Sequence, residues 1–248
     1  MMDILKPGER LDDLQCGGFF LIQKPGTFCL NTDSVLLADF AAPRKHERAA
    51  DLGSGNGAVA ILMAAHQREM TIDAVEIQPE MADMAARSAR YNGIDGRMTV
   101  HCMDMQSAWQ EIGHQSRSLV VCNPPYWGKG RSLVSETDPH RIARHEDELT
   151  PAVVAKAAEQ LLKYGGRFCV IYPAQRALEM MQAMEGCGIA PKRLRSIHTF
   201  AHKAPKLVLI EGIKGGGQGL NWLAPLILYD APGVPSAEYR RIYNMDLT

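Results

Sequence analysis

The sequence predicts an α/β fold with a mostly parallel sheet and helices on both of its faces. Strand and helix patterns alternate from residue 48 onward, and a glycine-rich turn, DLGSGNG at residues 51–57, joins the first strand of this series to its helix. Strict alternation favours right-handed crossovers between parallel strands. The chain has 248 residues, which suffices for one large core. We therefore expect an N-terminal extension over residues 1–47 and a main domain over residues 48–248.

The N-terminal extension is expected to contain a hairpin and a helix. Residues 18–30, GFFLIQKPGTFCL, have the pattern of two short strands around a turn at residues 24–26. Residues 31–34, NTDS, then offer several capping side chains to an apolar run that ends at Pro43. This predicts a helix of about two to three turns.

The elements of the main domain follow in a regular series. In chain order we expect a strand at 48–53, a helix at 57–67, a strand at 71–77, a helix at 79–93, strands at 97–104 and 118–125, a helix at 151–166, a strand at 167–173, a helix at 174–188, and late strands at 206–216 and 225–230. Residues 128–149 have no clear periodicity. A loop that long in a compact domain is usually functional or mobile.

Composition excludes several classes of protein. The formal net charge of -1 argues against a strongly basic nucleic-acid binder, so a polyanion would need a local basic patch. The six cysteines form no CxxC pair and the histidines lack ligand spacing with them, which predicts reduced thiols and no metal site. The chain begins with acidic residues and lacks a long apolar run. We therefore expect a soluble, cytoplasmic protein that does not cross a membrane.

The glycine turn favours a ligand at the end of the first strand. Gly53, Gly55 and Gly57 allow a sharp turn and a close approach that a Cβ would block. Their GxGxG spacing differs from the GxGxxG of dinucleotide folds and favours a ligand without a pyrophosphate. A purely structural turn is the alternative, because glycine-rich strand-to-helix turns recur in many nucleotide folds.

Acidic residues end the next two strands at the same predicted edge. Glu76 ends the second strand and can accept hydrogen bonds from both hydroxyls of a ribose, while Asp104 ends the third strand and can accept from an adenine amino group. Acids on the solvated surface are the alternative at both positions. Together with Asp51, they predict one crevice at the ends of three successive strands.

The fourth strand ends in an unusual loop, Asn123-Pro124-Pro125-Tyr126. Prolines have no N–H, so the loop presents hydrogen-bond acceptors with little competing donation. The Asn123 side-chain oxygen and the Pro124 carbonyl can accept both hydrogens of an exocyclic amino group, and Tyr126 can stack on its ring. A rigid turn with a surface tyrosine is the alternative. The loop predicts a site for a planar NH2 group.

Over residues 48 to about 213 the order of these motifs resembles that of class I S-adenosylmethionine-dependent methyltransferases. The resemblance implies a Rossmann-like fold with a seven-stranded sheet, a late reversed strand, and S-adenosylmethionine as cofactor. It assigns catalysis to Asn123, Pro124, Pro125 and Tyr126. It assigns cofactor binding to Asp51, Gly53, Ser54, Gly55, Asn56, Gly57, Glu76, Ile77, Asp104, Met105 and Asn123. A second resemblance, to adenine-N6 methyltransferases, adds Thr32 and Asp33 to the cofactor pocket, with a simple helix cap as their alternative role.

Two families of amino-directed methyltransferases share the NPPY loop, one acting on adenine N6 and one on a glutamine amide of release factors. Residues 18–41, the NPPYW stretch and the tail with PLILYD and AEYRRIYN resemble bacterial tRNA adenine-N6 methyltransferases. This resemblance implies a monomer that binds a tRNA anticodon loop and modifies the adenosine at nucleotide 37 of a valine tRNA. A glutamine-N5 methyltransferase and a non-catalytic RNA-binding module remain the alternatives.

Basic and aromatic side chains near the predicted site are candidates for RNA binding, where they would hold phosphates while a base turns into the pocket. They are Trp127, Lys129, Arg131, Arg141, Arg144, Lys192, Arg193, Arg195, Lys203 and Lys206. Ordinary solvated surface charge is the alternative for each of them.

Overall fold

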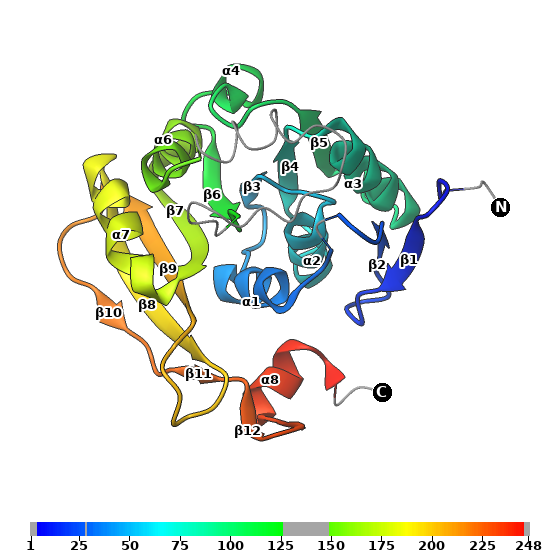
Figure 1. Cartoon of the computed structure of the whole chain (residues 1–248). Helices are drawn as coiled ribbons and strands as arrows, with labels where there is room; N and C mark the ends of the chain where they lie inside the picture. The colour runs from blue at the N-terminus through cyan, green and yellow to red at the C-terminus, as the bar shows by residue number, and fades with distance from the viewer. Residues whose placement is uncertain (1–3, 28, 126–148, 246–248) are drawn as a thin grey trace.

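A computed structural model describes residues 4–27, 29–125 and 149–245 of the protein (Figure 1). Its central sheet has the strand order β8-β9-β7-β6-β3-β4-β5, and two two-residue strands, β10 and β11, pair with β8. The strands are β3 (Arg48–Leu52), β4 (Thr71–Glu76), β5 (Met98–Cys102), β6 (Arg117–Cys122), β7 (Leu162–Pro173), β8 (Ile189–His198), β9 (Leu207–Lys214), β10 (Asn221–Trp222) and β11 (Leu226–Ile227). Strands β3 to β7 are mutually parallel, whereas β9 is antiparallel to both of its neighbours. The predicted fold class, with its late reversed strand, is confirmed.

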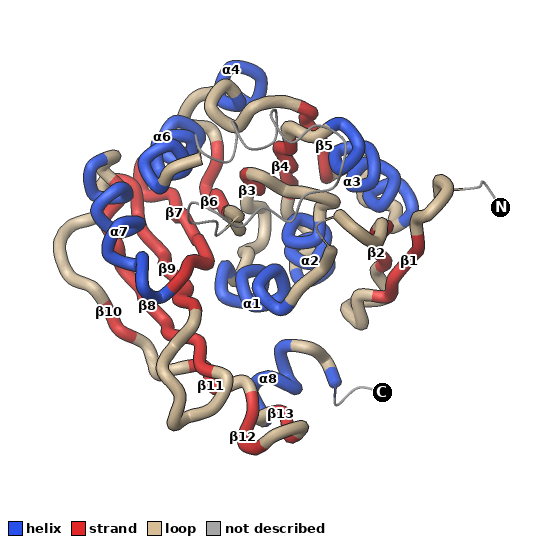
Figure 2. The backbone as a smooth tube through the Cα atoms, in the orientation of Figure 1, coloured by secondary structure: helices blue, strands red, loops and turns tan. Residues whose placement is uncertain are grey.

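Helices cover both faces of the sheet (Figure 2). One core contains side chains from α1 (Thr32–Ala41), α2 (Ala58–His66), α3 (Pro79–Tyr91) and α8 (Ala237–Ile242), and the other from α4 (Ala108–Ile112), α6 (Pro151–Leu161) and α7 (Ala177–Gly186). In β6, Leu119 and Val121 belong to the first core, while Val120 and Cys122 belong to the second. This alternation follows from the two-residue period of a strand. The continuous apolar run of β6 therefore contributes side chains to both cores.

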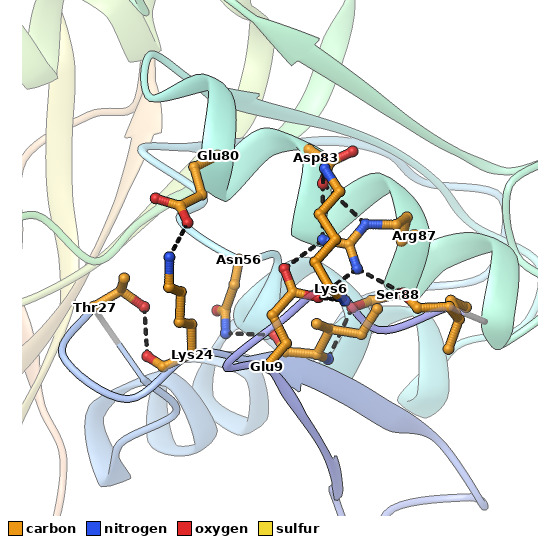
Figure 3. A network of polar contacts seen from close by, with 11 residues as sticks. Lys6, Glu9, Lys24, Thr27, Asn56, Glu80, Asp83, Arg87 and Ser88 are labelled. Carbon is orange, nitrogen blue, oxygen red and sulfur yellow. Dashed lines mark hydrogen bonds and ion pairs between the residues drawn. The ribbon is translucent and has the colours of Figure 1, made fainter.

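The N-terminal hairpin is fastened to α3. It consists of β1 (Arg10–Asp13) and β2 (Phe20–Gln23), which pair antiparallel. Arg87 of α3 donates two hydrogen bonds of 2.6 Å to the carboxylate of Glu9, just before β1 (Figure 3). The exposed fractions of these two side chains are only 9% and 2%. The hairpin is therefore held by a buried ion pair as well as by apolar contacts.

The expected pairing of this hairpin was wrong. The turn at residues 24–26 does form, with the Thr27 amide donating to the Lys24 carbonyl over 3.1 Å and Gly26 at a φ of 88°. Among the described residues between this turn and α1 there is no strand, and β2 pairs instead with the preceding β1. The Leu30 amide donates to the side chain of Gln23. That bond directs the chain toward α1 rather than back along β2.

The helix predicted after residues 31–34 is confirmed as α1. The side chain of Asn31 caps it by accepting from the Ser34 amide over 3.1 Å, and Ala42 ends it in a left-handed conformation. Strand β8 and helix α4 were not predicted. The late strand expected at 225–230 is divided between β11 and β12 (Tyr229–Ala231), and β12 pairs with β13 (Val234–Pro235). A short 3-10 helix (Ala174–Arg176) precedes α7.

Most of the aperiodic stretch 128–149 lies outside the described residues. Across the parts of the chain that the structure does describe, no helix combines the length and apolarity needed to cross a bilayer.

Candidate active site

The predicted site residues converge on the carboxyl edge of the sheet. Strands β5, β4, β3 and β6 are parallel neighbours, and their last residues are in register: Leu52 pairs with Cys122, and Glu76 pairs with Cys102. The segments that leave these strands therefore begin side by side. They are the glycine turn after β3, Ile77 after β4, Asp104 after β5 and Asn123 after β6.

The three glycines of the turn all have left-handed backbones, with φ values of 69°, 59° and 88° for Gly53, Gly55 and Gly57. A Cβ on Gly57 would lie 3.1 Å from the Cβ of Ala85 and 3.2 Å from the Cε of Met98. Gly57 is thus required for the close approach of the start of α2 to α3. The motif serves the fold as well as access by a ligand.

Glu76 holds the glycine turn in place. One oxygen of its buried carboxylate accepts from the Gly55 amide and the other from the Gln78 amide, each over 2.8 Å. Burial raises the pKa of Glu76 above its usual value. Because each carboxylate oxygen can accept more than one hydrogen bond, the side chain can bind two ligand hydroxyls without releasing the turn.

Three buried oxygen atoms belong to the turn. By hydrogen-bond geometry the Asp51 Oδ2, the Ser54 Oγ and the Asn56 Oδ1 have no partner within the described chain, although the neighbouring Ser54 hydroxyl acts to lower the pKa of Asp51. Burial raises the pKa of Asp51 to about 7. Buried polar atoms are ordinarily paired, so this group points to a ligand that supplies donors. The α-ammonium of the methionine part of S-adenosylmethionine fits that requirement.

The remaining predicted cofactor residues lie on the β4 and β5 side. Ile77 is an exposed apolar side chain, 42% accessible, directly after Glu76. The Asp104 Oδ1 accepts from the Gln106 amide over 2.9 Å, and Met105 lies 3.5 Å from the position of a Cβ on Gly53. Apolar surface next to a carboxylate suits an adenine ring.

The orientation of Asn123 is set by α1. Its Nδ2 donates to the Ser34 Oγ over 3.4 Å, and Ser34 lies 3.2 Å from the Asn31 Oδ1. That Asn31 atom also accepts from the Ser34 amide, so it is the oxygen, and the Ser34 hydroxyl must donate to it. Ser34 can then only accept from Asn123. The Asn123 nitrogen consequently faces α1, and its oxygen is directed away from Ser34.

The rest of the loop and the α1 residues are placed as follows. Pro124 is buried and Pro125 is exposed, whereas Tyr126 lies outside the described residues. Thr32 and Asp33 are half-buried at the start of α1. Sequence reasoning considered this stretch but missed Ser34. Its position three residues after a capping Asn was the available signal.

Several basic residues proposed for RNA binding are engaged within the chain. The Lys192 ammonium donates to the carbonyls of residues 217–219, while Arg193 pairs with Glu211 at 3.2 Å and Arg195 with Glu238 at 2.7 Å. Lys203 and Lys206 are exposed on the turn between β8 and β9. Trp127, Lys129, Arg131, Arg141 and Arg144 lie outside the described residues.

Metal-ligating side chains do not gather in the described ranges: none of the His, Cys, Asp and Glu residues there form a group of three or more that could hold an ion. The chemistry of the site is built from backbone groups, carboxylates and amides.

Comparisons with known proteins identify the family of the chain. The family model of the methyltransferase small domain matches residues 19–188. The tRNA1(Val) (adenine(37)-N6)-methyltransferase of Cronobacter sakazakii is 31% identical over 196 residues, which are 77% of this chain and 78% of that protein. Among solved structures, a predicted O-methyltransferase, protein Atu636 from Agrobacterium tumefaciens, has a TM-score of 0.70 at 23% identity and covers 86% of this chain and 96% of its own.

A geranyl diphosphate methyltransferase in complex with S-adenosylmethionine has a TM-score of 0.54 at 14% identity and covers 73% of this chain and 84% of its own. Likenesses at these identities show the fold, and the match to the family model shows the family. The chain therefore belongs to the methyltransferase small domain family, and it is a methyltransferase.

Proposed function

We propose that this enzyme methylates the exocyclic N6 of an adenine in tRNA, namely the adenosine at nucleotide 37 beside the anticodon of a valine tRNA. The name of the Cronobacter sakazakii relative supports the substrate. The observation on which the chemistry rests is the placement of Asn123 directly after β6, at the sheet edge shared by Glu76 and the glycine turn. Its oxygen is directed away from α1 and is suited to accept from an amino group.

The cofactor residues divide by the part of S-adenosylmethionine that they suit. Asp51, Ser54 and Asn56 would hold the methionine part through their buried acceptors. Glu76 would bind the ribose hydroxyls, and Ile77, Asp104 and Met105 would surround the adenine. When bound, the cofactor supplies a methyl group that is already activated on a sulfonium, so the task of the protein is alignment and electrostatic stabilisation.

Asn123 and Pro124 would act on the accepting amine. The N6 of adenine is a poor nucleophile because its lone pair is delocalised into the ring. Acceptors that hold both hydrogens out of the ring plane favour a pyramidal nitrogen and expose that lone pair. Tyr126 would stack on the base and offer its π face to the positive charge that develops on nitrogen. The departing proton would pass to water.

Asn123→Ala tests this assignment. Removing one electrostatic partner of a reacting group usually costs at least about 100-fold in kcat, so we expect a loss of that size with the affinity for S-adenosylmethionine nearly unchanged. Glu76→Ala is the matched variant and should weaken cofactor binding instead. Calorimetry and single-turnover methylation of tRNA measure the two effects. Equal losses of affinity and rate in Asn123→Ala would refute the role of Asn123.

The two alternative functions are not favoured. A glutamine methyltransferase would label a release factor and leave tRNA unlabelled, and a non-catalytic RNA-binding module would keep its function without Asn123. Incubation of the protein with labelled cofactor and either substrate separates the three. A cytoplasmic location and a monomeric state remain predictions, to be checked by cell fractionation and by analytical ultracentrifugation.

A further inference from the structure

The turn between β8 and β9, residues 199–206, has a stacked aromatic pair at its tip. The rings of Phe200 and His202 are 5.7 Å apart between centroids and nearly parallel, at 12°. His202 is exposed and Phe200 is half-buried. The Phe200 ring lies 6.2 Å from Tyr229, which in turn lies 5.5 Å from Tyr239. An exposed imidazole is therefore supported from beneath by a series of aromatic rings.

The turn itself is held by internal hydrogen bonds. The Lys203 amide donates to the Phe200 carbonyl over 3.0 Å, and the His198 Nδ1 lies 2.7 Å from the Lys203 carbonyl, to which it donates. The Lys206 carbonyl accepts from Ala174, just after β7, over 2.9 Å. These bonds fix the backbone at Lys203 and Lys206, which are exposed residues of the same turn as the aromatic pair.

Strand order places this turn at the same edge of the sheet as the loop that contains Asn123. Cys122, the last residue of β6, pairs with Val170 of β7, and Pro173, the last residue of β7, pairs with Leu207, the first residue of β9. The turn at residues 199–206 precedes Leu207, so it extends beyond the carboxyl end of β7. Strand β9 lies two strands from β6, a lateral separation of roughly 10 Å at about 4.8 Å per strand, on the side opposite β3 and β4.

We propose that Phe200, His202, Lys203 and Lys206 form an RNA-binding surface that stacks an unpaired base flanking the target adenosine and neutralises the adjoining phosphates. The inference rests on the proposed function, whose substrate is a single-stranded loop. Sequence-specific RNA recognition mostly uses such loops, whose unstacked bases stack on aromatic and histidine rings. The ammonium groups of Lys203 and Lys206 supply local positive charge for the phosphates, on a chain whose formal net charge is -1.

His202→Ala is the central test because this exposed side chain can be removed without opening the core. With an unmodified tRNA1(Val) transcript, we expect about a tenfold rise in KM and in the Kd measured without cofactor, since stacking on one ring is commonly worth that factor or more. The value of kcat and the affinity for S-adenosylmethionine should stay within about twofold. His202→Tyr should restore binding because it restores a stacking ring.

The lysines are tested by salt dependence. A Lys203→Gln and Lys206→Gln double variant should reduce the slope of log K against log salt by about 1.4, since each phosphate contact to a single strand contributes about 0.7. Tyr164→Ala and Lys163→Gln are the matched controls, because both residues are exposed at the opposite end of β7. Neither should change tRNA binding.

Three outcomes would each overturn the proposed RNA-binding surface. They are an unchanged Kd for tRNA in His202→Ala, a failure of His202→Tyr to restore binding, and equal losses of binding in the control variants. These outcomes are distinct from failure of the proposed function. If the wild-type protein leaves tRNA unmethylated, the function is refuted, and the binding measurement without cofactor still decides whether the surface exists.

Discussion

At the scale of single residues, the amide of Asn123 owes its orientation to a short chain of donors and acceptors in α1. The Ser34 amide donates to a side-chain atom of Asn31, which must therefore be the oxygen. The Ser34 hydroxyl donates its only hydrogen to the same oxygen. The Ser34 oxygen can then only accept from the Asn123 nitrogen. An asparagine amide can otherwise rotate and present nitrogen in place of oxygen. Ser34 is therefore a positioning residue for the catalytic loop.

Substitution of Ser34 should separate rate from cofactor affinity. In Ser34→Ala the hydrogen bond from the Asn123 nitrogen to the Ser34 hydroxyl is lost, so we expect kcat for tRNA methylation to fall about tenfold, the equivalent of one lost hydrogen bond. The affinity for S-adenosylmethionine should change less than twofold. Ser34→Thr keeps the hydroxyl and should recover most of the rate. A wild-type kcat in Ser34→Ala, or a threonine variant as slow as the alanine variant, would argue against this role.

The raised pKa of Asp51 predicts that cofactor binding depends on pH. Burial raises this pKa to about 7 from its usual value of 3.8, so between these values the folded protein holds a proton that the unfolded chain has lost. The contribution of Asp51 to stability is therefore full below about pH 4 and falls as the pH rises through 7. A cationic ammonium beside Asp51 favours the ionised form. Cofactor binding at about pH 6 should then release a proton.

Calorimetry at about pH 6 in two buffers of different ionisation enthalpy measures this release. The wild-type protein should release up to one proton per cofactor, and Asp51→Asn should release distinctly less. Proton uptake by the wild type, or equal release by the two proteins, would show that Asp51 does not meet the ammonium.

At the scale of elements, the N-terminal hairpin depends on one buried ion pair. Arg87→Met would leave the Glu9 carboxylate buried without its partner (Figure 3). Breaking such a pair is strongly destabilising, and we expect a loss of about 3 kcal/mol in the free energy of unfolding. Lys24→Met removes the exposed pair with Glu80 on the same hairpin and should cause no resolvable loss. Urea denaturation compares them, and equal losses would contradict this account.

Most elements of the sheet were predictable because their apolar periodicity is local. Strand β8 was not, because Lys192, Arg193 and Arg195 interrupt its apolar residues. Their charges are satisfied by carbonyls at 217–219 and by Glu211 and Glu238, which only the tertiary structure brings near. Strand β1 was missed for a related reason. Its sequence, RLDD, is mostly polar, and the Asp12 side chain is bound by Gln23 of β2.

The candidate site was predictable as far as strand ends determine it. Glu76 ends β4, Asp104 and Asn123 come soon after β5 and β6, and parallel strands bring their ends to one edge. The direction of a side-chain amide is a three-dimensional property, which is why Ser34 escaped notice. The same limit applies to Phe200 and His202, whose stacking depends on a turn between two strands of which one was not predicted.

At the scale of the whole molecule, the two strands beyond β7 extend the sheet past the catalytic loop. On one side of Asn123 lie the glycine turn and Glu76, and on the other lie β9, β8 and their connecting turn. The C-terminal segment β11–α8 packs beside β8 and α1 (Figure 1). It supplies Tyr229 behind Phe200 and Tyr239 beside Thr32. We therefore propose that the cofactor and the RNA bind at one edge of the sheet.

The most direct test of the central claim is nucleoside analysis by mass spectrometry after the protein has been incubated with S-adenosylmethionine and unmodified tRNA1(Val). The account predicts one N6-methyladenosine per tRNA, located at nucleotide 37, and none with Asn123→Ala. Methylation of a release-factor glutamine with tRNA left unmodified, or N6-methyladenosine formed equally by Asn123→Ala, would contradict it.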